Sequence, residues 1–336
     1  MISFGVAKHD VWLSAVLAAL LGLTGNYLLI ALGLRYPSQT VIQYSQQILG
    51  SWAGRFIGLL YINFFLLIAA LTTRDFAELF LLIMPDTPIS VFIGVILLMA
   101  AYTSVHGLEV IARTSEVLVP FLLLGIIVGI LGNIPNMDLL NLLPVLEDGW
   151  QPVIIDGITQ VPYLGLAVFW LFLLPSLNIK TGAKKTLLFS ISIVSLVILL
   201  VSITIVVVLG SDTPVTLNYQ FFNVVRQISL ANIIERIEPM FLISWSSTSF
   251  LAVTLFYYIT ATSIKQWLGL KNYRPLILPI GAVIFTLSIF LFPSYAELRQ
   301  FFSLERFGMM AIPIEFGIPL VLLGLSYIKD KIIKQG

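Results

Sequence analysis

Charged residues are scarce in this chain. They make up 10% of its 336 residues, against roughly a quarter in ordinary soluble domains. The formal net charge is +1 with no basic stripe, which argues against a nucleic-acid partner. Cysteine is absent, which excludes disulfides, iron–sulfur clusters and thiolate metal sites. The only histidines, His9 and His106, lie far apart in the sequence, so we expect neither a histidine metal centre nor a catalytic triad.

Motifs for cofactors and catalysis are missing as well. The chain contains no GxGxxG sequence and no phosphate-binding P-loop, which argues against ATP-driven transport within this polypeptide. No acid, base and nucleophile cluster along the sequence, so we expect no enzyme and no cofactor.

Long apolar runs are what the sequence has in abundance. Hydrophobic residues make up 59% of the chain, and runs longer than about 18 residues suffice to cross a bilayer as helices. The runs are continuous instead of alternating, which predicts helices and not barrel strands. We therefore predict an all-α polytopic membrane protein of about nine spans: residues 11–34, 56–83, 89–105, 117–134, 153–177, 186–210, 240–264, 273–292 and 311–328.

The basic residues give this topology a direction. Most of the lysine and arginine falls in one set of loops, including Arg35, Arg113 and Lys184, and such loops face the cytoplasm. The prediction is an N-terminus outside and a C-terminus inside. The amphipathic segments 35–55 and 217–238 are expected to lie on the membrane surface, on the cytoplasmic and outer sides respectively.

Three charged residues stand near the end of the second span: Arg74, Asp75 and Glu78. An isolated charge inside the bilayer costs about 2.5 to 3.5 kcal/mol, so this group should be paired and should face protein. Arg74 and Glu78 are four residues apart and share a helical face. Two interpretations remain open: a ligand or ion-pathway site, or a structural ion pair that locks this helix to a neighbour.

The span at 153–177 carries Gly157, Pro162 and Gly165, with Tyr163 beside them. Proline removes a backbone donor and clashes with the preceding turn, so the helix is predicted to break at Gly157, Pro162 and Gly165. Discontinuous helices at membrane depth line substrate sites in transporters. A simple proline kink is the competing explanation.

Further charges occur at span ends. Glu235, Arg236 and Glu238 precede a span rich in small hydroxylated residues, where they form either a gate or docking point or an interfacial anchor. Glu315, between Pro313 and Pro319 in the last span, is a further candidate for a buried charge.

Three stretches together resemble the B-subunit family of GerA-type spore germinant receptors, within the amino acid/polyamine/organocation transporter superfamily. They are YPSQTVIQYSQQILGSWAGRFIGLLY, YINFFLLIAALTTRDFAELF and NIIERIEPMFLISW. The resemblance implies a single transmembrane domain, residues 1–336, with a LeuT-like fold of ten helices in two inverted repeats. It implies a subunit that senses an amino acid, sugar or nucleoside in the spore inner membrane, working with an A subunit and a lipoprotein C subunit.

Carried over by position, the resemblance implies a ligand site between the repeats. Two departures stand against it. Only four spans, at 11–134, precede the second repeat at 153–328, so we expect the first helix to be missing, by truncation, an internal start or degeneration. Phe169 stands where relatives often have an acidic residue. The implied lining residues are Phe64, Ile68, Tyr163, Gly165, Leu166, Thr248 and Ala252.

Three hypotheses follow. The first is a germinant-receptor subunit that binds a small nutrient and signals to partner subunits. The second is a secondary transporter of amino acids or polyamines. The third is a truncated scaffold that assembles with partners and binds no ligand.

Overall fold

The computed structural model describes residues 7–177, 182–210, 219–228 and 238–335, and these ranges contain helices and no β-strand. In the labels below, η marks a 3₁₀ turn, except in η7 and η8, which are π-helical. The first half comprises η1 (Lys8–Asp10), α1 (Val11–Arg35), α2 (Val41–Leu49), α3 (Ser51–Leu81), α4 (Ile89–His106), α5 (Leu108–Leu131), η2 (Ile134–Asn136) and η3 (Leu139–Leu142). The second comprises α6 (Trp150–Gly165), η4 (Leu166–Phe169), α7 (Trp170–Leu173), η5 (Leu174–Ser176), α8 (Ala183–Leu209), α10 (Gln220–Arg226), α11 (Glu238–Leu268), η6 (Arg274–Leu276), α12 (Ile277–Phe290), α13 (Tyr295–Phe301), η7 (Leu304–Gly308), α14 (Met309–Ile312), η8 (Pro313–Gly317) and α15 (Ile318–Gln335).

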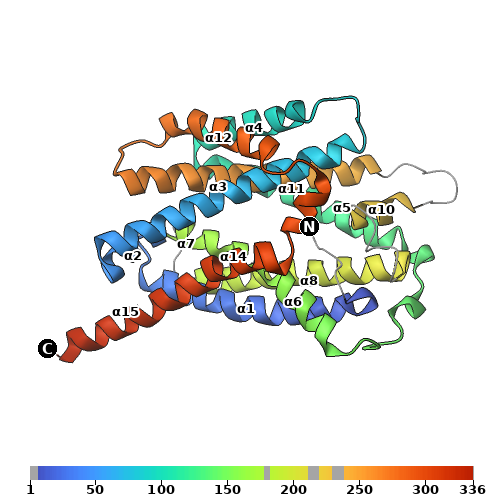
Figure 1. Ribbon diagram of the computed structural model, residues 1–336, viewed down its shortest axis with the longest axis horizontal. Helices are drawn as coiled ribbons and strands as arrows, with labels where there is room; N and C mark the ends of the chain where they lie inside the picture. The colour runs from blue at the N-terminus through green and yellow to red at the C-terminus, as the bar shows by residue number, and fades with distance from the viewer. Residues whose placement is uncertain (1–6, 178–181, 211–218, 229–237, 336) are drawn as a thin grey trace.

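The long helices run roughly along one direction in two groups (Figure 1). One group holds α3, α4, α11 and α12, which pack against one another. In the other group, α1 lies against α6, α8 and α15. The largest buried apolar cluster is centred on the first group, and residues of α1, α7 and the last span extend it. The last span thus connects the two groups.

The described residues contain eight helices long and apolar enough to cross a membrane, or nine if the bent pair Arg274–Phe290 and Tyr295–Phe301 is one span. All nine predicted apolar runs fall on these helices. Three predicted spans begin more than one turn too late, because α3 begins at Ser51, α5 at Leu108 and the last span at Leu304. The first turns of α5 carry the exposed ion pair Arg113 and Glu109. Because these turns are polar, a search for apolar runs does not include them in the helix.

Of the three residues where a break was predicted, Gly165 lies at the break, and Gly157 and Pro162 do not. α6 is continuous α-helix through both residues and becomes 3₁₀ only after Gly165. Gly157 instead allows close packing, since a Cβ there would lie 2.8 Å from Leu17 Cδ2 of α1. Pro162 removes one donor, and tight packing of α6 on α1 holds the remaining ladder in place.

The last span is interrupted by two π-helical stretches, Leu304–Gly308 and Pro313–Gly317. π-helical turns interrupt α-helices mostly as single turns, frequently at functional sites. The α12–α13 pair bends by 105°. Irregular backbone therefore concentrates in the second half of the chain.

Two short helices accompany the spans. α2, in the amphipathic segment 35–55, buries Val41, Ile42 and Tyr44 against its neighbours and packs on α3 and α11. α10 forms in the predicted outer segment 217–238, most of whose other residues lie outside the described ranges. α2 precedes α3 and α10 precedes α11 along the chain. The two inverted repeats stay a prediction.

Candidate functional site

Arg74 of α3 is buried, and its guanidinium is surrounded by acceptors. Its Nε and Nη2 atoms both lie 2.7 Å from Glu78 Oε1. Its Nη1 atom donates to the carbonyls of Ser288 and Ile289, each at 3.1 Å. Those carbonyls belong to the last turn of α12, where a cation is favourable. This geometry matches the interpretation of Arg74 and Glu78 as a structural tie.

Asp75, the next residue along α3, has different neighbours. The Tyr219 hydroxyl donates to the Asp75 carbonyl at 2.9 Å and to its Oδ1 atom at 3.3 Å. The Tyr219 ring stacks on Tyr295, with centroids 5.2 Å apart, and meets Trp245 edge-on at 6.1 Å. Burial, and after it the Asp75 charge, raises the pKa of Tyr219 well above its usual range, so this phenol remains a donor.

Tyr163 of α6 completes this group of residues. Asp75 and Tyr295 are the groups that act electrostatically on its hydroxyl. Its ring lies against Phe302, which follows α13, and against Phe307 of the last span, with centroids 6.4 and 6.3 Å away. We call Asp75, Tyr163, Tyr219, Trp245 and Tyr295 the Asp75 cluster.

Two donors of the Asp75 cluster have no partner among the described residues. The Tyr163 hydroxyl and the Trp245 Nε1 atom are both buried and form no hydrogen bond within the described part of the chain. Buried polar groups are nearly always paired, and an exception requires an explanation. A bound polar molecule that accepts from these donors is one such explanation. A carboxyl group and two free donors thus belong to one cluster, drawn from separate segments.

A second polar position lies at the end of α6. Glu315, within η8, is 0% exposed, and both its carboxyl oxygens lack hydrogen-bond partners among the described residues. A Cβ added to Gly165 would lie 2.1 Å from Glu315 Oε2, so only glycine permits this approach. The interrupted span α6–η4 and the interrupted last span therefore meet at Gly165 and Glu315.

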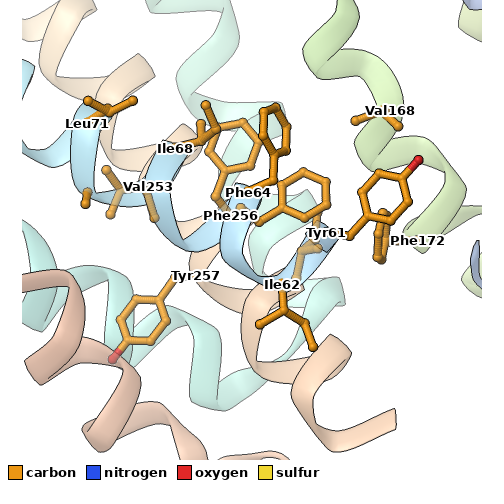
Figure 2. Close-up of a cluster of buried hydrophobic side chains, with 14 of the residues drawn as sticks. Tyr61, Ile62, Phe64, Ile68, Leu71, Val168, Phe172, Val253, Phe256 and Tyr257 are labelled. Carbon is orange, nitrogen blue, oxygen red and sulfur yellow. The ribbon is translucent and has the colours of Figure 1, made fainter. Parts of the chain in front are cut away.

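The other predicted ligand residues are packed as core (Figure 2). Phe64 and Ile68 are 2% and 4% exposed and lie in one cluster with Phe256 and Phe172. Leu166 and Ala252 pack against the same cluster. The Thr248 hydroxyl donates to the Ser244 carbonyl of its own helix at 3.0 Å. Four of these predicted residues are thus apolar and belong to the core or pack against it. The fifth, Thr248, uses its hydroxyl donor within its own helix.

The charges before α11 are placed only in part. Glu238 lies 3.8 Å from Arg226, and their side chains are 28% and 58% exposed. Such a pair at the rim contributes little to stability. Glu235 and Arg236 lie outside the described residues.

Sequence reasoning missed Tyr219, Tyr295 and Asn26. Asn26 Nδ2 of α1 donates to the carbonyls of Gly22 and Leu164, at 2.8 and 3.1 Å, which joins α1 to the last turns of α6. An asparagine inside an apolar span is a detectable signal, because buried polar groups in membranes seek partners. The tyrosines carry no such signal, because tyrosine is common at the ends of membrane helices.

The groove between α1, α7 and α8 offers no free polar group for a ligand among its described residues. Its walls are apolar apart from Asn26, whose amide is already engaged. Within the described ranges, no three histidine, aspartate or glutamate residues come together as metal ligands.

Comparison with known proteins gives a consistent result. A family described as "Spore germination protein" matches residues 2–316. Spore germination protein KB of Bacillus subtilis is 28% identical over 323 residues, which covers 95% of this chain and 85% of that protein. Spore germination protein A2 of the same organism is 27% identical over 331 residues, covering 96% and 88%.

Proposed function

The chain belongs to the spore germination protein family, and we propose that it is the nutrient-binding subunit of a germination receptor in the spore inner membrane. It binds a small molecule, either an amino acid, a sugar or a nucleoside, and signals to partner subunits to start germination. The A subunit and the lipoprotein C subunit implied by the family resemblance are its proposed partners. The observation that carries this proposal is the Asp75 cluster with its two unpartnered donors.

The Asp75 cluster has the composition of a small-molecule site. Such sites combine aromatic walls with a few placed polar groups, and here three tyrosines and a tryptophan accompany one carboxyl group. A ligand oxygen is expected to accept from Tyr163 and Trp245, whose donors have no partner in the part of the chain that the structure describes. Asp75 can accept from a ligand ammonium or hydroxyl group. Amino acids, sugars and nucleosides all present such groups.

The aromatic core beside the cluster supports a signalling role. Phe64 and Ile68 belong to the main apolar core, and Tyr163 lies on α6, shortly before the interruption after Gly165. A ligand that orders Tyr163 therefore acts on the helix that contacts both α1 and the last span. Coupling of this kind needs a difference in ligand affinity between two arrangements of these helices.

The test is the dose response of germination in spores that carry Tyr163→Phe. This change keeps the ring and removes the hydroxyl, so it costs about 0.5 to 1.5 kcal/mol of ligand binding. The nutrient concentration for half-maximal germination should rise about 2- to 12-fold, at unchanged protein level. Tyr102→Phe is the matched control, since Tyr102 is 70% exposed on α4. An unchanged dose response in Tyr163→Phe spores would argue against the proposal.

A secondary transporter is the second candidate, favoured by the interruptions in α6 and the last span. The full chain reconstituted in vesicles should then accumulate a labelled amino acid or polyamine. Uptake that Tyr163→Phe reduces and Tyr102→Phe leaves intact would establish transport through this site. Ligand binding without uptake would leave the receptor as the sole function.

A further inference from the structure

Glu315 is a buried carboxyl group that the proposed ligand site does not use. It is 0% exposed and sits in the π-helical turn Pro313–Gly317. Both oxygens lack hydrogen-bond partners among the described residues. Other buried carboxyl groups in this chain differ, since Asp10 accepts from the backbone nitrogen of Leu146 at 3.0 Å.

Glu315 lies where two interrupted spans touch. Its Oε2 atom packs on Gly165, the last residue of α6 before the 3₁₀ stretch. The adjacent Phe316 ring covers this contact, because a Cβ on Gly165 or on Gly25 of α1 would lie within 2.7 or 2.3 Å of it. The carboxyl group is therefore enclosed by α1, α6 and its own span.

The charge state of Glu315 follows from this enclosure. An ionised carboxylate without a partner costs several kcal/mol or more in an apolar interior, so such a group takes up a proton instead. The neutral acid fits this arrangement better, although its own donor also lacks a partner, at a cost of about 1 to 3 kcal/mol. The ionised form therefore gains far more free energy than the neutral acid if the two spans separate and water reaches the carboxyl group.

Tyr61 of α3 is an ionisable group on which the charge of Glu315 acts. Its hydroxyl donates to the Ile314 carbonyl at 3.1 Å, so it holds the backbone beside Glu315 and leaves the carboxyl group alone. A neutral phenol adds no charge that would compensate an ionised Glu315.

The ionisable groups on the other elements packed against η8 are directed elsewhere. On α6, Asp156 accepts from the Ala7 backbone nitrogen at 2.8 Å, and Tyr163 belongs to the Asp75 cluster. On α1, Arg35 pairs with Asp330. η4 and α14 contain no ionisable residue, and those of α15 begin only at Tyr327.

We propose that Glu315 is a proton-binding site whose protonation holds the last span against α6. In the closed contact the carboxyl group is neutral. Loss of the proton creates a charge that the closed contact cannot accommodate, so the two spans separate at Gly165. Acid therefore favours the closed contact, and rising pH opens it. The proposal does not rest on nutrient binding and goes beyond it.

The chain offers a direct test because it contains no cysteine. Ala311, one turn before Glu315 on α14, is 0% exposed, and Ala311→Cys puts a single small thiol there. The purified full-length protein is treated with a small methanethiosulfonate reagent from pH 5 to pH 9. Lys271→Cys in the exposed loop after α11 is a separate reference for the pH dependence of the thiol itself.

The normalised labelling rate of Ala311→Cys should rise about tenfold per pH unit over the range where Glu315 loses its proton. In Glu315→Gln, which keeps shape and lacks the charge, the rate should stay low and flat. Glu305→Gln, an exposed change in the same span, should keep the wild-type profile.

Three results would overturn the proposal: a flat wild-type profile, the same pH dependence in Glu315→Gln, or loss of pH dependence in Glu305→Gln. A response to sodium or potassium at fixed pH, without a response to protons, would assign the site to a metal cation instead. Infrared spectroscopy gives a second measurement. The protonated-carboxyl band of the acidic protein should lose one component in Glu315→Gln, and an identical band in both proteins would contradict a neutral Glu315.

Discussion

α3 and the last span each bury ionisable groups, and the two regions treat them in opposite ways. In α3, Arg74 and Glu78 neutralise each other, and Arg74 also binds two carbonyls of α12. In the last span, Glu315 has neither a counter-ion nor a hydrogen bond within the described residues. A satisfied pair holds helices together in one arrangement. An unsatisfied carboxyl group makes its arrangement depend on protons.

The largest expected effect comes from breaking the Arg74–Glu78 ion pair. Arg74→Met leaves Glu78 as an unpaired buried charge and removes the donor to the end of α12. The free energy of unfolding should fall by about 3 to 5 kcal/mol, measured as thermal unfolding of the purified protein in detergent. Arg113→Met breaks a similarly spaced Arg–Glu pair whose side chains are 75% and 76% exposed, and should change stability by at most about 0.5 kcal/mol. Equal losses in both variants would contradict a structural role for Arg74.

The double variant Arg74→Met with Glu78→Leu separates the contribution of the ion pair from that of the hydrogen bonds to the end of α12. Replacing a whole buried pair with apolar residues costs far less than removing one partner. The double variant should recover most of the stability lost in Arg74→Met. A loss of about 1 to 2 kcal/mol in the free energy of unfolding should remain, because the carbonyls of Ser288 and Ile289 lose their donor. Full recovery in the melting experiment would show that the cap contributes nothing.

Removing the unpaired carboxyl group of Glu315 should instead increase the free energy of unfolding. Glu315→Met fills a similar volume without a polar atom, so it should stabilise the protein by about 1 to 3 kcal/mol at pH 5. Folding of the wild type takes up a proton at Glu315, so wild-type stability falls as pH rises above the usual glutamate pKa of about 4.3. The gain in melting temperature should therefore grow from pH 5 toward neutral pH. A destabilised Glu315→Met would reveal a partner for the carboxyl group.

A smaller effect is expected from the contact between the two interrupted spans. Gly165→Ala places a methyl group against Glu315 Oε2 and the Phe316 ring, and overpacking of this kind costs about 1 to 2 kcal/mol. Gly324→Ala is the control, because a Cβ there meets no atom within 4 Å. It should be neutral or slightly stabilising in the same melting experiment. A tolerated Gly165→Ala would show that the contact is loose.

Part of the candidate site was predictable from sequence. The i, i+4 spacing of Arg74 and Glu78 predicts their pairing, because residues four apart share a helical face. Their second partner, the end of α12, lies more than 200 residues away, and no local pattern indicates it. Asp75 illustrates the same limit, since its neighbour Tyr219 comes from a short segment between spans.

The proline and glycine pattern in α6 predicted a break correctly at Gly165 and wrongly at Gly157 and Pro162. Pro162 and Gly157 sit within continuous helix, and the change to 3₁₀ follows Gly165. Local chemistry shows which residues tolerate a break. Packing decides where the break occurs, and here α1 supports the helix up to Leu164 through Asn26.

The sequence by itself determined that this chain is an all-α membrane protein. Long continuous apolar runs with few charges have no other stable form in a bilayer, because every backbone group in lipid must be paired within its own helix. Tertiary structure decided which polar groups are satisfied. Among the described residues Arg74 has three acceptors and Glu315 has no hydrogen-bond partner, since pairing depends on which distant segments meet at a residue. This difference in hydrogen-bond partners, which the sequence does not show, distinguishes a structural ion pair from a candidate proton site.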